Sequence, residues 1–156
     1  MRDSRPYQCE SCNRGESIQT RLEQRQCVAG FVFTATLHAR ECPACRLREI
    51  DGASLAQFDL GVARALALSG VVDAEAFRFM RESVGYERDR AAIELGSSPS
   101  ELAAWEAGLT PLPVGMMNEL CRIVLSRTAD PLLPHVTARP LARPLPDANL
   151  RRHRCA

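Results

Sequence analysis

Hydrophobic and polar residues alternate along two stretches near the start of the chain. Residues 17–26 have the sequence SIQTRLEQRQ, and residues 31–39 have the sequence FVFTATLHA. Such an alternation is typical of β-strands that bury one face. Ala29 and Gly30 lie between the two stretches and suit a turn. The pattern therefore predicts a β-hairpin.

A helical period replaces this alternation from residue 52 onward. Ser69 and Gly70 mark the end of the helical stretch. The apolar residues that recur at helical spacing on one face are Leu55, Phe58, Val62 and Leu66. The pattern predicts a helix that links the hairpin to the rest of the chain.

Shorter helical stripes follow, separated by glycine or proline. Asp73 and Ser98 are suitable N-caps, Pro99 suits the first helical position, and Gly96 suits a helix end. The stripes cover residues 74–84, 87–95, 99–107 and 114–124. The periodicity alone predicts an α-helical bundle. A glycine-containing turn between the second and third of these helices is typical of a helix-turn-helix.

Two Cys-x-x-Cys pairs flank the predicted hairpin. CESC supplies Cys9 and Cys12, and CPAC supplies Cys42 and Cys45. Both thiolates of such a pair can reach one ion from a single turn, and two pairs make the tetrahedral sulfur set that Zn²⁺ prefers in closed, structural sites. The hairpin fills the 29 residues between the pairs and brings them together. The pattern predicts a structural zinc site.

Other interpretations of the cysteines remain open at this point. The four thiols could be two redox dithiols or simple core thiols. Catalytic zinc is disfavoured, because such sites usually hold three protein ligands and an open position. Since a sheet this small buries little apolar area, we expect the metal to supply much of its folding free energy. Cys27, Cys121 and Cys155 have no partner at ligand spacing.

Charge and composition narrow the class of protein. All 20 basic residues are Arg, whose planar guanidinium groups suit carboxylates and phosphates. The formal net charge of +1 does not by itself indicate a nucleic-acid partner. Residues 51–126 carry 6 Arg and 11 acidic residues, whereas the last 30 residues carry 6 Arg and 2 acidic residues. Any contact between the chain and a phosphate group must therefore overcome repulsion from the acidic residues of segment 51–126.

The sequence has no feature of a membrane or secreted protein. No apolar run approaches the roughly 20 residues of a membrane helix, and the N-terminal residues MRDSRPYQCE lack the hydrophobic segment of a signal peptide. We therefore expect a cytoplasmic protein without a membrane partner. We do not expect an enzyme, because no Ser/His/Asp constellation is apparent and the paired cysteines are assigned to metal.

The helical region resembles a known DNA-binding family. The sequence FRFMRESVGYERDRAAIELGSSPSELAAWEAGLTPLP, residues 77–113, is similar to the Cro/repressor-type (Xre) domain. With the upstream cysteine pairs, the chain to about Arg127 resembles the MqsA (YgiT-type) antitoxins. The resemblance implies an N-terminal zinc domain that binds a toxin. It also implies a C-terminal helix-turn-helix that dimerises and represses its own operon.

The same resemblance suggests roles for four charged residues. In the family, the residue that opens the second helix is usually Gln and touches a phosphate, and Arg88 stands there in this chain. A guanidinium matches phosphate geometry, so we expect Arg88 to contact the DNA backbone with help from Arg90. The alternative is that both are solvated charges. Arg81 and Glu106 fall where the family forms a partly buried ion pair, and we interpret both as structural.

The predicted recognition helix lacks the usual base-reading residues. Where the family places Asn and Arg against base edges, this chain has Ser100 and Ala104. A bidentate Arg or Asn contact is worth roughly 1–3 kcal/mol of discrimination, so specificity should be weak or shared with DNA shape and dimer spacing. The candidate DNA-contacting residues on this face are Ser97, Ser98, Ser100, Glu101 and Ala104.

These patterns predict an α+β fold in four parts. Residues 1–51 form a small zinc-binding β-hairpin domain, residues 52–72 a bridging helix and linker, and residues 73–127 an all-α helix-turn-helix bundle. Residues 128–156 form a proline- and arginine-rich tail that we expect to be extended or flexible. The tail either solubilises the chain or adds salt-sensitive phosphate contacts through Arg139, Arg143, Arg151, Arg152 and Arg154.

The sequence thus predicts a transcriptional regulator that binds double-stranded DNA as a homodimer. We expect the antitoxin of a type II toxin–antitoxin pair, with a cognate toxin as partner and structural Zn²⁺ as cofactor. The alternative function is a zinc-containing interaction adaptor whose helical bundle no longer reads DNA specifically.

Overall fold

The protein has an α+β fold with one antiparallel sheet and five helices in the described residues. The computed structural model describes residues 8–129 and 132–141. In chain order the elements are β1 (Ile18–Val28), β2 (Phe31–Glu41), β3 (Arg48–Glu49), α1 (Gly52–Ser69), α2 (Ala74–Ser83), α3 (Arg88–Leu95), α4 (Pro99–Glu106), α5 (Val114–Arg127) and β4 (Thr137–Pro140). None of these helices is both long and apolar enough to cross a membrane.

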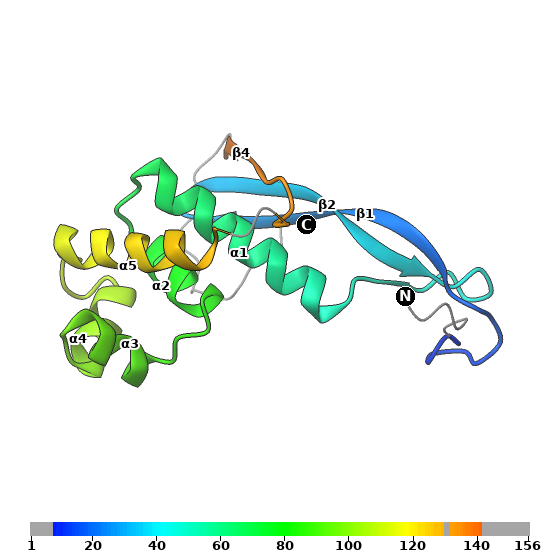
Figure 1. The fold of residues 1–156 in the computed structure, drawn as a ribbon, viewed down its shortest axis with the longest axis horizontal. Helices are drawn as coiled ribbons and strands as arrows, with labels where there is room; N and C mark the ends of the chain where they lie inside the picture. Colours follow the sequence, from blue (N-terminus) through cyan, green and yellow to red (C-terminus); the bar gives the residue numbers. More distant parts are fainter. Residues whose placement is uncertain (1–7, 130–131, 142–156) are drawn as a thin grey trace.

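The predicted hairpin is confirmed. β1 and β2 pair in antiparallel register from Val28 opposite Phe31 to Ile18 opposite Glu41. Ala29 and Gly30 make the turn with φ values of 50° and 78°. Positive φ at both central residues matches the right-handed twist of the strands and is favourable for glycine. The turn therefore lies at one end of a long ribbon, and both cysteine pairs lie at the other (Figure 1).

Two short strands extend the sheet along the other edge of β2. β3 pairs near the cysteine end, where Arg40 lies opposite Glu49, and β4 pairs near the turn, where Thr34 lies opposite Thr137. The hydroxyl groups of Thr34 and Thr137 are 2.7 Å apart, and the N–H of Leu141 donates to the carbonyl of Gly30. β4 is held by these polar contacts rather than by buried side chains.

β4 corrects part of the sequence-based description of residues 128–156. We expected an extended or flexible tail, but residues 137–140 form a strand of the sheet. All four β4 residues are exposed, so no apolar periodicity marks the strand in the sequence. Arg139 belongs to β4 and is exposed. The other candidate arginines of the tail, at positions 143, 151, 152 and 154, lie outside the described residues.

The helix boundaries follow the capping residues. The carboxylate of Asp73 accepts hydrogen bonds from the N–H groups of Glu75 and Ala76 at the start of α2. Gly70 and Gly96 end α1 and α3 in the left-handed conformation that glycine adopts without a Cβ clash. α4 begins at Pro99 after the cap Ser98. These signals are local, which is why the sequence located the helices.

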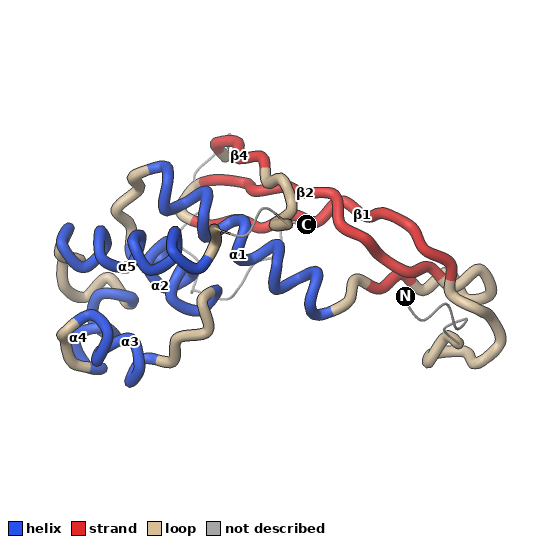
Figure 2. Tube along the Cα trace, viewed as in Figure 1, coloured by secondary structure: helices blue, strands red, loops and turns tan. Residues whose placement is uncertain are grey.

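One hydrophobic cluster joins the turn end of the hairpin to the helices. Figures 1 and 2 show α1 along the hairpin, with the other helices gathered near its turn end and the cysteine loops projecting away. The largest buried side chains of this cluster come from the sheet, α1, α2, α4 and α5: Val28, Phe58, Val62, Leu66, Phe77, Met80, Leu102, Met117, Leu120 and Val124. Toward the cysteines the cover on β1 thins, and Ile18 is 56% exposed.

The turn is also hydrogen-bonded to the helical region. The N–H of Ala29 donates to Glu75 Oε2 at 2.9 Å. Ala29 is at the tip of the hairpin, and Glu75 is in the first turn of α2. The contact adds a polar link between the hairpin turn and α2 beside the shared hydrophobic cluster.

Candidate metal centre and helical surface

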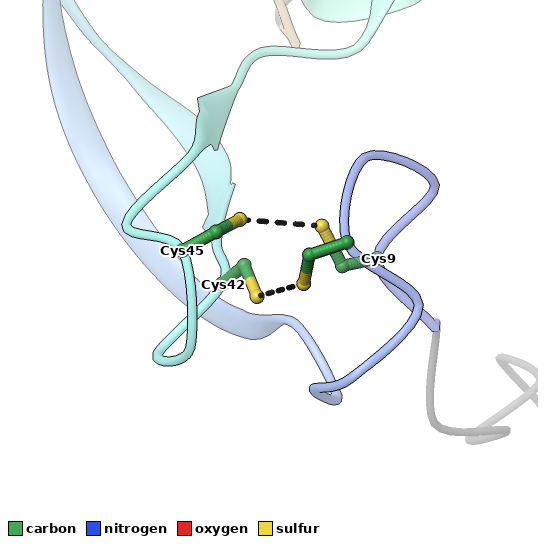
Figure 3. A group of neighbouring side chains, drawn as sticks. Cys9, Cys42 and Cys45 are labelled. Carbon is green, nitrogen blue, oxygen red and sulfur yellow. Dashed lines mark hydrogen bonds between the residues drawn. The ribbon is translucent and has the colours of Figure 1, made fainter.

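Four cysteine sulfurs meet at the free end of the hairpin. The Sγ atoms of Cys9, Cys12, Cys42 and Cys45 all lie within 4.8 Å of one another. Cys9 Sγ is 3.7 Å from Cys45 Sγ, and Cys12 Sγ is 3.6 Å from Cys42 Sγ (Figure 3). A disulfide bond is about 2.05 Å long, so these are free thiols. Their arrangement could hold a metal ion.

Each cysteine pair lies in its own backbone turn, and the two turns are of the same type. The N–H of Asn13 donates to the carbonyl of Cys9 at 2.9 Å, and the N–H of Arg46 donates to the carbonyl of Cys42 at 2.8 Å. Asn13 and Arg46, which each follow the second cysteine of a pair, have φ values of 52° and 62°. In both loops, this type of turn places the two sulfurs of the pair on one side.

The hairpin explains the long spacing between the pairs. Cys12 precedes β1 and Cys42 follows β2, and the two strands run antiparallel with their turn at the far end. Residues that flank an antiparallel hairpin necessarily end side by side. Figure 2 shows the cysteine loops beyond this open end of the ribbon. The spacer therefore positions the pairs instead of separating them.

Gly15 is a residue of this site that the sequence analysis missed. A Cβ atom at position 15 would lie 3.1 Å from Cys42 Sγ and 3.2 Å from the Cβ of Ala44. The carbonyl of Gly15 also accepts the N–H of Cys9 at 3.0 Å. A residue without a side chain therefore leaves room for the sulfur cluster. The only sequence signal was a glycine close behind the first cysteine pair.

Electrostatics favour a cation among the sulfurs. Hydrogen bonding from the backbone N–H of Cys45 lowers the pKa of Cys42 to about 7, against the effect of burial. The N–H of Leu47 acts to lower the pKa of Cys45, but burial and the neighbouring thiols raise it to about 12. Cys45 thus resists the loss of its proton beside the other sulfurs. A bound cation would remove that resistance by compensating the thiolate charges.

The surface around α3 and α4 contains the other candidate residues. Ser100 and Glu101 are exposed, whereas Ser97, Ser98 and Ala104 are half-buried. The Oγ atom of Ser97 is buried and has no hydrogen-bond partner among the described residues. Ser97 and Ser98 precede α4, Ser100 and Glu101 lie in its first turn, and Ala104 lies in its second turn.

Glu101 has a structural contact that the sequence analysis did not assign. Its Oε2 accepts the N–H of Ser98 at 2.9 Å, while the N–H of Glu101 donates to Ser98 Oγ at 3.3 Å. This reciprocal pair is a capping box. Hydrogen bonding from the Ser98 side chain holds the pKa of Glu101 below its usual value. The Ser-x-x-Glu spacing in the sequence was the available signal.

We expect Ser98→Ala to lower the free energy of unfolding by about 1 kcal/mol, because α4 would lose its N-cap. Urea denaturation followed by far-ultraviolet circular dichroism measures this loss. Ser126→Ala is the control, since Ser126 is exposed on α5 and is not a cap residue of that helix. Equal losses in the two variants would contradict the capping role.

A charged group in the helical region consists of Arg81, Glu106 and Arg88. Arg81 donates to Glu106 through both Nε and Nη2, and both residues are buried, at 4% and 3% exposure. Arg88 Nε donates to Glu106 Oε2 at 3.0 Å, with its side chain 49% exposed. This second contact has no signal in the sequence. One carboxylate thus holds two guanidinium groups, one buried and one at the surface.

Arg90 lies apart from this group. It is exposed on α3, and its guanidinium carbon is 4.7 Å from the ring centroid of Tyr86. The candidate arginines of α3 therefore have different environments, one bound by a carboxylate and the other over an aromatic ring.

Comparison with known proteins adds no family to these observations. No protein-family model and no curated protein matches the chain. The functional interpretation therefore rests on the four-cysteine cluster and the helical surface.

Proposed function

We propose that the chain is a zinc-containing, DNA-binding transcriptional regulator, the antitoxin of a toxin–antitoxin pair that represses its own operon. The observation that carries the proposal is the α3–α4 pair. Two short helices are joined at Gly96, and α4 begins with a capped, exposed first turn. A helix-turn-helix presents the N-terminal residues of its second helix to DNA in this manner.

Zn²⁺ is the proposed metal. The site offers four sulfur ligands from two matched turns, and Cys9 and Cys42 are buried. Tetrahedral sites with four thiolates favour zinc, and a complete set of protein ligands suits a structural role. The ion would stabilise the free end of the hairpin, where Ile18 is exposed and apolar cover is thin.

The two ends of the molecule suit two partners. The cysteine loops project away from the helices, so a protein bound there would leave the α3–α4 surface open (Figure 1). The resemblance to MqsA antitoxins supports a toxin at the zinc domain and a homodimer of helix-turn-helix units on DNA. Such dimers bind half-sites about one helical turn apart. A cytoplasmic location accompanies this proposal.

A second candidate function is an interaction adaptor whose helices no longer read DNA specifically. Glu101 favours it, because its carboxylate is engaged by Ser98 and would be repelled by phosphate. Ser100 and Ala104 replace the base-reading Asn and Arg that the family resemblance implies. The adaptor would retain the helical scaffold without sequence-specific binding.

DNA binding discriminates between the two functions. We expect the protein to bind a duplex from upstream of its own gene more tightly than a scrambled duplex of the same length and composition. We expect Arg88→Ala to reduce the slope of log affinity against log salt concentration by about 0.9, the effect of one phosphate contact. Fluorescence anisotropy over a series of salt concentrations measures both quantities.

Arg122→Ala is the charge-matched control. Arg122 is exposed on α5 beside Gly70 and Val71 at the end of α1, outside the α3–α4 pair, so its loss should leave the slope unchanged. Equal affinity for the two duplexes at physiological salt would exclude the specific repressor and favour the adaptor.

A further inference from the structure

We propose that Arg90 and Arg127 form a pair that binds the phosphate backbone of duplex DNA, organised by Tyr86. This inference rests on the proposed DNA-binding function and assigns it a contact outside α4. The two arginines are 37 residues apart in sequence, one on α3 and one in the last turn of α5.

Both guanidinium groups contact the ring of Tyr86. Both guanidinium carbons lie 4.7 Å from the centroid of its ring. Arg127 Nη2 also donates to the Tyr86 hydroxyl at 3.1 Å, and Arg127 Nη1 donates to the carbonyl of Val84 at 3.2 Å. Arg81 donates to the backbone carbonyl of Tyr86 from the buried side. The ring is 5% exposed, so it is a fixed platform for the arginines.

The charge of this pair is not compensated within the described residues. Arg78, Arg81, Arg88 and Arg122 each lie within ion-pair distance of a carboxylate. In the same part of the chain, neither Arg90 nor Arg127 has such a partner. Glu87 and Asp89 are close in sequence, yet neither forms an ion pair with them. Two like charges, each 4.7 Å from the centroid of one ring, make the local potential positive, and an anion bound beside them would reduce it.

The exposure and chemistry of the pair suit a phosphodiester chain. Arg90 and Arg127 are both exposed, so a large ligand can reach them. Each guanidinium presents a planar set of donors that matches phosphate oxygens. Arg88 opens the same helix α3 and is half-exposed.

Phosphate contacts by this arginine pair would also compensate for the weak base recognition expected of α4. Phosphate contacts supply affinity and fix orientation without reading sequence. A protein whose recognition helix offers only serine, alanine and a capped glutamate therefore needs such contacts elsewhere. The arginine pair would supply them from α3 and α5.

The experiment measures the salt dependence of affinity for the duplex from upstream of the gene. We expect Arg90→Gln and Arg127→Gln each to reduce the slope by about 0.9, and the double variant by about 1.8. Arg127→Lys keeps the charge and should retain the slope. Arg122→Ala, whose guanidinium lies beside Gly70 and Val71 at the end of α1, is the control and should match the unmodified protein.

Arg127 also contacts the α2–α3 connection, so Arg90→Gln provides a test that leaves those hydrogen bonds in place. Reduced slopes in Arg90→Gln and Arg127→Gln, with the slope retained in Arg127→Lys, would support the pair. Unchanged slopes in folded Arg90→Gln and Arg127→Gln would overturn it while leaving DNA binding intact. Failure of the unmodified protein to bind any duplex would instead overturn the proposed function itself.

Discussion

Replacement of Cys42 by serine is expected to abolish stoichiometric metal binding and to unfold the cysteine end of the hairpin. Cys42 is 1% exposed, and its Sγ is 3.6 Å from that of Cys12, so it belongs to the centre of the cluster. Structural zinc sites contribute roughly 10–16 kcal/mol of apparent binding free energy in small domains. Loss of one of four thiolates removes most of that contribution, and no apolar core replaces it at this end.

The turn end should survive the same substitution. Val28 and Phe33 belong to the hydrophobic cluster that includes Phe58 of α1, and Glu75 of α2 accepts the N–H of Ala29. We therefore expect helical structure to remain while amide protection is lost near the cysteines. Metal content by mass spectrometry and hydrogen exchange by segment measure the two effects. Chelation of the unmodified protein should give the same exchange pattern.

Cys121→Ser is the matched control. Cys121 is half-buried on α5 and is not among the clustered cysteines. It should keep the full metal content and the exchange pattern of the unmodified protein. Joint loss of protection in the hairpin and in α2–α5 after chelation would contradict the separation of the metal-dependent end from the helices.

The parts of the fold that the sequence predicted are those with local signals. The hairpin follows from alternation over each strand and from the Ala29–Gly30 turn, which has positive φ at both positions. The helix ends follow from caps such as Asp73 and Gly96. β4 lacked such a signal, because its side chains are exposed and its partner strand is about a hundred residues earlier in the chain. Backbone pairing over that distance leaves no periodicity to detect.

The candidate site shows the same division. The four-cysteine cluster was predictable because the two Cys-x-x-Cys pairs are visible in the sequence. The predicted hairpin between them brings the pairs together. The capping role of Glu101 was also available from its spacing to Ser98. The contact of Arg88 with Glu106 and the stacking of Arg127 on Tyr86 depend on helices packing together. Tertiary contacts of this kind cannot be assigned from spacing alone.

Glu106→Ala is expected to lower the free energy of unfolding by about 3 kcal/mol, because the buried Arg81 guanidinium loses its bidentate carboxylate and, among the described residues, keeps only the carboxylate of Glu82, whose Oε1 is 3.5 Å from Nη2. The side chains of Arg81 and Glu106 are 5% and 2% exposed, so water cannot replace the lost partner. Urea denaturation monitored by circular dichroism measures the change. Glu119→Ala removes an exposed carboxylate paired with Arg122 and should cost no more than about 1 kcal/mol.

A double variant distinguishes the stability lost with the ion pair from the stability lost by leaving one charge buried and unpaired. Replacing both members in Arg81→Met with Glu106→Leu removes the buried charges together, and such replacements are often close to neutral. We therefore expect the double variant to be more stable than Glu106→Ala, although Arg88 also loses its contact with Glu106. That contact is half-exposed and contributes little on its own. If Glu106→Ala were no less stable than Glu119→Ala, the buried pair would not hold α2 against α4.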